Sequence, residues 1–260
     1  MRSQIAPSTK PGESVARPSA VTGEIPERDP LADLVSRSIG ARVESVEVEV
    51  LPAPDGVERQ RLRFTTATGA SSAIFERLPR GETIEAQLLP FLARKSDRVP
   101  ALRSRGLPPP HASPGPWVLI EDVYAGTPAC DDDPIAVLDA KRAIERAVAN
   151  DLPALRALGL HDDARDLPHE LAAAPRGLLH GDLRCENALR VDRGVVLVGW
   201  RGAHIGAVIL DAASLVLDLE QHERHDDADA VRRAYGETEL FALAERFLLR
   251  APRPDTPQPG

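Results

Sequence analysis

Residues 178–189 read Leu-Leu-His-Gly-Asp-Leu-Arg-Cys-Glu-Asn-Ala-Leu, and no other stretch of the chain carries as much information. The pattern is His-x-Asp-x-x-x-x-Asn between apolar flanks, with His180, Asp182 and Asn187 at the fixed positions. At this spacing an aspartate can accept a proton from an attacking hydroxyl, while an asparagine five residues later can turn back toward a metal that holds nucleotide phosphates. Asp182 is therefore a candidate catalytic residue and Asn187 a candidate metal ligand, with Arg184 between them.

The two ends of the 260-residue chain are rich in proline and polar residues, and we expect residues 1–29 and 251–260 to be disordered tails. The remaining residues 30–250 are enough for one large domain or for two lobes, since a domain usually has roughly 100–200 residues. Hydrophobic residues make up 42% of the chain and aromatic residues only 3%, so leucine, valine, isoleucine and alanine must form the core.

The acidic residues outnumber the basic residues by 40 to 32, which gives a net charge of −8. This balance argues against binding to nucleic acid or to an anionic membrane surface, because both are polyanions. No apolar run reaches the ~18 residues of a membrane helix, and the N-terminus lacks the apolar segment of a secretory signal. We therefore predict a cytoplasmic location, with no nucleic-acid partner and no membrane partner.

The chain has two cysteines, Cys130 and Cys185, and neither belongs to a Cys-x-x-Cys pair. The spacing therefore predicts no zinc site and no redox motif, and reduced thiols are the expectation for a cytosolic protein. We interpret Cys185 as an ordinary loop residue, because no neighbouring base is evident that would activate its thiol. The acidic run 131–133 is expected to cap a helix.

The first half of the chain alternates apolar and polar residues with the period of two that is typical of β-strands. The pattern predicts a turn at 67–70 and strands at 43–51, 59–66, 71–78 and 116–123. A short amphipathic helix is predicted at 30–39, capped by Asp29 and ended by Gly40. A second helix is predicted at 82–95, where Pro90 should kink or split it.

The second half repeats apolar residues with the period of 3.6 that is typical of helices. Two short strands are predicted at 188–191 and 195–200, and helices at 134–152, 210–219 and 227–249. Pro153 should end or kink the first of these helices. The distribution predicts an α+β, bilobal chain: a small β-rich N-lobe at 30–122, a hinge near 121–126 and a larger helical C-lobe at 123–250. A nucleotide would lie between the lobes.

The loop at 178–189 is followed, at a fixed spacing, by a strand that runs to a tryptophan, by Ala-x-x-Gly and by a further aspartate. This order resembles the aminoglycoside phosphotransferase family of the protein-kinase-like fold, whose signature is His-Gly-Asp-Leu-x-x-x-Asn, an Ile-Asp-Trp-like triplet, Ala-x-x-Gly and Asp-Leu-Ala. The residues that match are His180, Gly181, Asp182, Leu183, Asn187, Trp200, Ala203, Gly206 and Asp211.

The resemblance implies catalytic roles within the loop. Asp182 would be the catalytic base, or the carboxylate that orients the substrate hydroxyl, and Asn187 would bind magnesium. Arg184 falls where the similar loop of protein kinases has a lysine, which implies a contact to the transferring phosphate. The cofactors implied are ATP and Mg²⁺.

Other residues would hold the loop and the nucleotide. His180 would pack beneath the loop, and Asp211 would accept hydrogen bonds from the loop amides. Backbone groups of Glu121 and Val123 would face the edge of the adenine ring. Glu85, on the helix that follows the third strand, would hold a phosphate-binding lysine of that strand.

Two departures from the family pattern argue against ordinary use of ATP and Mg²⁺. The family has its principal metal-binding aspartate just before the tryptophan, and this chain has Gly199 there. Glycine offers no carboxylate, so an ion that bridges the nucleotide phosphates loses its main ligand.

The second departure is the missing lysine of the strand at 71–78. In one register Glu76 takes the place of the lysine and faces Glu85, and two like charges at ~4 Å would cost roughly 4 kcal/mol at an effective dielectric constant of about 20. In the other register Arg77 faces the cleft, pairs with Glu85 and contacts the phosphates, because alternate residues of a strand point to opposite faces. The sequence leaves both registers open.

These observations leave three hypotheses. The first, which the departures favour, is a kinase-fold pseudoenzyme that is impaired in Mg–ATP phosphoryl transfer and acts by binding or modulating a protein partner, which completes its site. The second is an active ATP-dependent O-phosphotransferase that acts on a small-molecule or peptide hydroxyl with Asp182, Arg184 and Asn187. The third is an unrelated α+β binding module without a two-lobed cleft.

Overall fold

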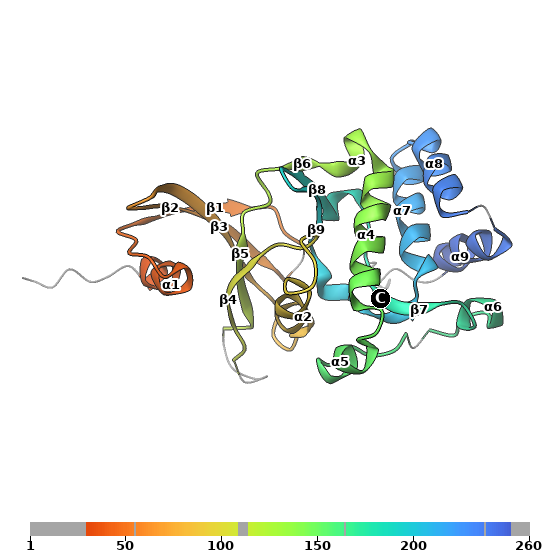
Figure 1. Ribbon diagram of the computed structural model, residues 1–260, viewed down its shortest axis with the longest axis horizontal. Helices are drawn as coiled ribbons and strands as arrows, with labels where there is room; N and C mark the ends of the chain where they lie inside the picture. The colour runs from red at the N-terminus through yellow and green to blue at the C-terminus, as the bar shows by residue number, and fades with distance from the viewer. Residues whose placement is uncertain (1–29, 55, 109–113, 164, 237, 251–260) are drawn as a thin grey trace, which may run out of the picture.

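The computed structural model describes residues 30–54, 56–108, 114–163, 165–236 and 238–250. A five-stranded antiparallel sheet forms one end of the molecule, and a larger helical part forms the other (Figure 1). The predictions for the two tails, including Asp29 as a helix cap, lie outside the described residues. Among the residues described, no helix is long and apolar enough to cross a membrane.

The sheet is built mostly from the period-two segments of the first half. Its strands lie in the order β1-β2-β3-β5-β4, and every neighbouring pair is antiparallel. Their bounds are β1 Val46–Leu51, β2 Glu58–Thr66, β3 Gly69–Arg77, β4 Leu102–Gly106 and β5 Trp117–Glu121. Sequence patterning does not predict the edge strand β4, because its sequence Leu-Arg-Ser-Arg-Gly contains a single large apolar side chain.

The two faces of the sheet pack against different helices. One face carries Leu62 and Phe75, which form a small core with α1 (Pro30–Ile39). The other face carries Ile74, which belongs to the main core together with α2 (Ile84–Leu92), the helix between the sheet and the helical part in Figure 1. Burial on both faces fixes the register of β3, since a slip of one residue would exchange the faces.

The helical part follows a short strand, β6 Thr127–Pro128. Its helices are α3 Ala129–Asp132, α4 Pro134–Val148, α5 Leu152–Ala157, α6 His169–Ala172, α7 Ile209–Gln221, α8 His225–Tyr235 and α9 Glu239–Arg250. Four further strands lie among them: β7 Arg176–Leu179 pairs with β10 His204–Ala207, and β8 Ala188–Val191 pairs with both β6 and β9 Gly194–Leu197. Helix α4 is capped as expected, because the Asp133 side chain accepts hydrogen bonds from two amides of its first turn.

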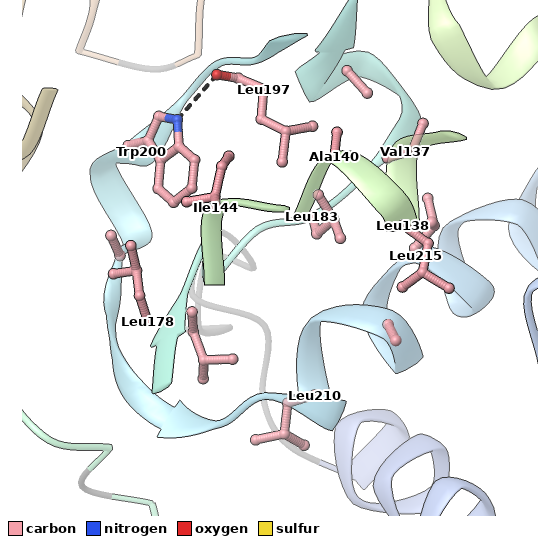
Figure 2. Close-up of a cluster of buried hydrophobic side chains, with 14 of the residues drawn as sticks. Val137, Leu138, Ala140, Ile144, Leu178, Leu183, Leu197, Trp200, Leu210 and Leu215 are labelled. Carbon is pink, nitrogen blue, oxygen red and sulfur yellow. Dashed lines mark hydrogen bonds between the residues drawn. The ribbon is translucent and has the colours of Figure 1, made fainter. Parts of the chain in front are cut away.

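The main core lies between α4, α7 and the strands that flank the candidate loop (Figure 2). Ile144 of α4, Leu215 of α7 and Leu183 of the loop belong to it. Trp200 is fully buried there, and its indole nitrogen donates to Leu197 O at 3.0 Å. The apolar residues around the loop therefore fix its two ends in a packed interior.

Two predicted elements are shorter than expected because glycines interrupt them. The helix predicted at 227–249 is two helices, α8 and α9, and Gly236 between them has a φ of 101°, a conformation that ends α8. The strand predicted at 195–200 ends at Leu197, and Gly199 beyond it has a φ of 77°. Both breaks thus lie where the backbone adopts a conformation that other residues avoid.

Two prolines affect their helices in different ways. Pro90 lies inside α2, which continues past it to Leu92 and ends there, so the predicted break comes two residues later. Pro153 lies in the first turn of α5, after α4 has ended at Val148, and the helix predicted at 134–152 is therefore two helices. Proline is tolerated in a first turn because the N–H that it lacks would have no partner within the helix.

Candidate functional site

Two buried aspartates of α7 hold the backbone of the candidate loop. Asp211 accepts hydrogen bonds from the amides of His180, at 2.7 Å, and Gly181, at 3.1 Å. Asp218, about two turns further along the helix, accepts one from the amide of Cys185 at 2.8 Å. Asp211 thus makes the contacts that the resemblance implies, and Asp218 is a second anchor that the sequence analysis missed.

Lys141 of α4 is buried beneath the same loop and was also missed. Its Nζ lies 2.9 Å from Asp211 Oδ2, 2.6 Å from Glu145 Oε1 and 2.8 Å from Leu178 O. Burial opposes the charge, but the two carboxylates outweigh it and raise the pKa of Lys141 above its ordinary value. A sequence signal was present, because the lysine falls on the apolar face of α4, four residues after Val137, where an unpaired charge would be costly.

His180 packs beneath the loop. Its ring is buried, its Nε2–H donates to Val198 O at 2.8 Å, and its ring centroid lies 4.6 Å from that of Trp200. Burial lowers the pKa of His180, so the imidazole is neutral at neutral pH. A neutral ring that is fixed in this way supports the loop and has no access to a reacting group.

The predicted catalytic and metal-binding residues of the loop lie together and bind one another. Arg184 Nε donates to Asp182 Oδ1 at 2.5 Å, and Asn187 Nδ2 donates to Asp182 Oδ2 at 3.1 Å and to its backbone oxygen at 2.8 Å. The side chains of Asp182 and Arg184 are each 37% exposed. Because both carboxylate oxygens already have a donor, Asp182 would have to exchange one of them for a substrate hydroxyl before it could act as a base.

Asn187 lies against Gly199, the position where the family has its metal-binding aspartate. Gly199 has a left-handed φ of 77°, and a Cβ atom added to it would lie 2.9 Å from Asn187 Oδ1. Within the described part of the chain, no group of three or more His, Cys, Asp or Glu side chains could hold a metal ion. Magnesium prefers oxygen ligands in near-octahedral geometry and is usually held by one or two carboxylates. Both carboxylate oxygens of Asp182 accept hydrogen bonds, Gly199 adds no oxygen ligand, and Asn187 Oδ1 is the one side-chain oxygen left, so this set does not fit that ion.

The structure selects one of the two registers that the sequence left open for β3. Glu76 faces inward and is 3% exposed. Arg77 is on the other face, where its Nη1 donates to Glu58 at 2.9 Å and its guanidinium lies over the Phe75 ring. The prediction that places Arg77 in the cleft beside Glu85 is therefore wrong, because Arg77 shares the face of the sheet that packs against α1.

A cation does reach the inner face, from the neighbouring strand. Arg59 of β2 is the cross-strand partner of Glu76, and its Nε donates to Glu76 Oε1 at 2.5 Å. Its guanidinium also lies 4.4 Å from the centroid of the Tyr124 ring. A second arginine of β2, Arg61, pairs with Asp122 at 2.7 Å. This part of the inner face is thus lined by ion pairs, none of which the sequence analysis identified.

Glu85 of α2 binds the backbone beside Gly199. Its Oε1 accepts a hydrogen bond from the amide of Trp200, the residue after Gly199, at 3.0 Å. Burial, together with the nearby charge of Glu76, raises the pKa of Glu85 to about 8, so this carboxyl carries a proton at neutral pH. Protonation of Glu85 relieves the conflict expected between two like charges.

The backbone groups of Glu121 and Val123, which were predicted to face adenine, form hydrogen bonds within the chain. Val123 N donates to Glu121 O at 3.0 Å, and Gly126 N donates to Val123 O at 3.0 Å. Burial opposes the charge of the Glu121 carboxylate, but its pair with Arg193, 2.7 Å from Nη2 to Oε2, lowers the pKa of Glu121. An adenine ring would therefore have to displace Glu121 O in order to bind the single N–H of Val123.

The two cysteines form a disulfide bond, which corrects the expectation of reduced thiols. Cys130 of α3 is bonded to Cys185 of the candidate loop, and their Cα atoms are 5.3 Å apart. The two residues are separated by 55 positions, so no local pattern reveals the pair. Cys185 is thus a cross-link of the loop, where the sequence suggested an ordinary loop residue.

Two cavities lie apart from this site. One, of about 500 Å³, lies between α4 and the strands β8 and β9, and its lining includes Arg98, Arg146 and Arg190. The other, of about 210 Å³, is lined mainly by apolar residues, among them Tyr235 and Leu240. Neither includes a residue of the candidate loop or of the inner face of β3, so neither corresponds to the predicted nucleotide cleft.

Part of the chain matches a known protein family. The sequence model of the Phosphotransferase enzyme family matches residues 125–247, which include the candidate loop and both of its anchoring aspartates. No curated protein matches the chain at a significant level.

Several solved structures share the fold of this chain. Aminoglycoside-3'-phosphotransferase of type VIII gives a TM-score of 0.53 at 19% identity, with 84% of this chain and 98% of that chain covered. Macrolide 2'-phosphotransferase MphH from Brachybacterium faecium gives 0.52 at 14% identity, covering 84% and 87%. Spectinomycin phosphotransferase gives 0.56 at 9% identity, covering 84% of each chain. The hypothesis of an unrelated module is therefore wrong, because the chain has the protein-kinase-like fold of these phosphotransferases.

Proposed function

We propose that this protein is a kinase-fold binding protein that is impaired in magnesium–ATP phosphoryl transfer and modulates a protein partner. The observation that carries the proposal is Gly199, which supplies no carboxylate where the family has its metal-binding aspartate. In phosphoryl transfer the metal bridges the phosphates and neutralises the charge that develops on them. A site without the acidic ligand loses a large part of that stabilisation.

The nucleotide side of the site supports the same proposal. Glu76 lies where the family has a phosphate-binding lysine, and its charge would repel the phosphates. The Arg59 guanidinium, which is paired with Glu76 and stacked on Tyr124, offsets this charge but leaves no net positive charge for the phosphates. Small-molecule pockets are lined mainly by apolar side chains. This face is lined by ion pairs such as Arg61–Asp122, which an adenine ring would have to displace.

The anchors beneath the loop support a binding role. Lys141, Asp211 and Asp218 hold the loop in a defined conformation, although the groups needed for turnover have changed. A folded surface is therefore what the chain offers to a partner, and a protein that docks over the loop would complete the site. The proposal includes a cytoplasmic location, where thiol reductants would act on the disulfide.

An activity assay with an Asp182→Ala control tests the proposal. Both proteins are incubated with Mg²⁺ and ATP, together with panels of small hydroxyl compounds and of peptides, and phosphate transfer is measured. We expect both proteins to give the same background. Turnover by the wild type that disappears in Asp182→Ala would contradict the proposal.

Thermal unfolding in the presence of nucleotide gives an independent measurement. A ligand at about 100 times its Kd adds about 2.7 kcal/mol to the unfolding free energy, enough to raise Tm by several degrees. We expect no rise with ATP or ADP, with or without Mg²⁺. A rise that requires both nucleotide and Mg²⁺ would show that the site still holds the metal complex.

One observation favours an active O-phosphotransferase on a small-molecule or peptide hydroxyl as a second candidate. Arg59 places a permanent positive charge beside Glu76, where a phosphate could compete for it. Arg63 of the same strand pairs with Glu49 and is 51% exposed, so it offers a matched control. An active protein should lose turnover in Arg59→Met and keep it in Arg63→Met, whereas an impaired protein should give background with both.

A further inference from the structure

The disulfide ties the candidate loop to the segment that follows the hinge. Cys185 lies between Asp182 and Asn187, and Cys130 lies in the four-residue helix α3, directly after β6. Cys130 is fully buried, whereas Cys185 is partly exposed. A thiol in solution can therefore approach the bond from the side of Cys185 and not from the side of Cys130.

We propose that the Cys130–Cys185 pair is a reversible thiol–disulfide exchange site, which takes a dithiol as its reductant and sets the mobility of the candidate loop. The bond joins two residues that lie 55 positions apart in the sequence. Neither the exchange nor its effect on the loop requires a nucleotide. The proposal therefore goes beyond the proposed function and can fail or hold independently of it.

The exchange takes place in two balanced steps. A thiolate of the dithiol attacks Cys185 Sγ, forms a mixed disulfide and releases the Cys130 thiolate, which takes up a proton. The second thiol of the reductant, as a thiolate, then attacks the reductant's own sulfur in the mixed disulfide and releases the Cys185 thiolate, which is protonated in turn. The protein gains two electrons and two protons, and the dithiol becomes a cyclic disulfide.

Where the disulfide holds the loop, hydrogen bonds hold it as well, and Val198 N donates to Asn187 O at 3.0 Å. In the turn at 185–187, Asp218 accepts from the Cys185 amide at 2.8 Å. The partner segment keeps a restraint of its own, because Arg224 Nη2 donates to Cys130 O at 2.5 Å. Reduction should therefore loosen the loop, because it removes the covalent restraint and leaves only hydrogen bonds, while α3 stays in place.

Release of the loop reaches the candidate site directly. The Asn187 side chain donates to Asp182 and closes the space beside Gly199. Motion of the turn that carries Asn187 weakens both of these contacts at once. The oxidised protein thus holds the closed arrangement, and the reduced protein samples open ones.

Thiol counting on the folded full chain tests the exchange. The chain has two cysteines, so the oxidised protein should show no free thiol and the protein treated with dithiothreitol should show two. Oxidised glutathione should then restore the bond. The proposal is overturned if two free thiols persist with oxidised glutathione, or if dithiothreitol opens the bond only in denaturant.

Hydrogen exchange, followed by mass spectrometry on the same samples, tests the effect on the loop. Amides of 183–190 should exchange roughly tenfold faster or more after reduction, because local opening becomes easier, whereas amides of β2 and β3 should not change. A Cys130→Ser variant without reductant should resemble the reduced wild type, which excludes an effect of the reductant itself. Equal protection of 183–190 in the oxidised and reduced wild type would overturn the role of the bond, whatever the phosphotransfer assay shows.

Discussion

The two sides of the candidate loop differ in how much of the family pattern they keep. Beneath the loop, Lys141 and Asp211 form a buried ion pair, and Asp211 also accepts hydrogen bonds from two loop amides. Above it, the resemblance implies that Gly199 and Glu76 lie where the family has its metal-binding aspartate and its phosphate-binding lysine. A buried charge can lose its partner only at a large cost in stability, and the buried carboxylate of Glu76 keeps a partner in Arg59. Under the proposed function, the fold therefore persists although the chemistry has altered.

Replacement of Lys141 by methionine should have the largest effect on stability. It leaves the Asp211 carboxylate buried without its cation, and breaking a buried pair in this way costs about 3–5 kcal/mol of unfolding free energy. Urea denaturation measures the loss. Lys95→Met is the matched control, because the pair of Lys95 with Asp151 is partly exposed and should contribute less than about 1 kcal/mol. Similar losses in the two variants would remove the contrast between the two sides of the loop.

Removal of the disulfide should have the next largest effect. The bond closes a loop of 55 residues, for which the chain-entropy estimate is about 4 kcal/mol at 25 °C and common values are about 2–4 kcal/mol. A Cys130→Ala/Cys185→Ala variant should therefore unfold at a lower urea concentration than the oxidised wild type. The reduced wild type should match the variant. If the reduced wild type and the variant unfolded at different urea concentrations, side-chain packing would contribute to the effect in addition to the cross-link.

The candidate loop is the part of the site that the sequence predicts best. Asp182 and Asn187 lie together as their spacing indicates, because the whole motif belongs to one short segment. The supports of the loop come from distant segments: Lys141 from α4 and Cys130 from α3. Long-range contacts of this kind leave only indirect signals in a single sequence, such as a lysine on the apolar face of a helix.

The cleft shows how a small error in register changes a predicted site. A four-residue turn at 67–70 would place Glu76 opposite Arg61, whereas the hairpin that forms has two turn residues and places Glu76 opposite Arg59. Alternation alone predicts that both arginines share a face. Which of them pairs with Glu76 depends on turn geometry, which the residues at 67–70 did not reveal.

The pH dependence of stability should show that Glu85 is protonated in the fold. Its pKa is about 8 in the folded chain, against an ordinary value of 4.5, so between these values the folded state binds the proton more strongly. The unfolding free energy should therefore fall as pH rises from about 5 to 8, by about 1 kcal/mol per pH unit, and level off at higher pH. Glu85→Gln keeps an acceptor for the Trp200 amide and should flatten this dependence. Equal slopes in the two proteins would mean that Glu85 is ionised in the fold.

The smallest effect is expected for Arg77→Ala, which tests the register of β3. The side chains of Arg77 and Glu58 are 36% and 59% exposed, so the loss should be ~0–1 kcal/mol in urea denaturation. Arg59→Ala should cost clearly more, because it leaves Glu76 buried without its cation. Both arginines lie on paired strands of one sheet, so the change in strand propensity is similar in the two variants. The difference between their losses of unfolding free energy therefore reports the face on which each arginine lies. A reversed order would place Arg77 in the cleft, where it could contact phosphates and restore the case for an active phosphotransferase.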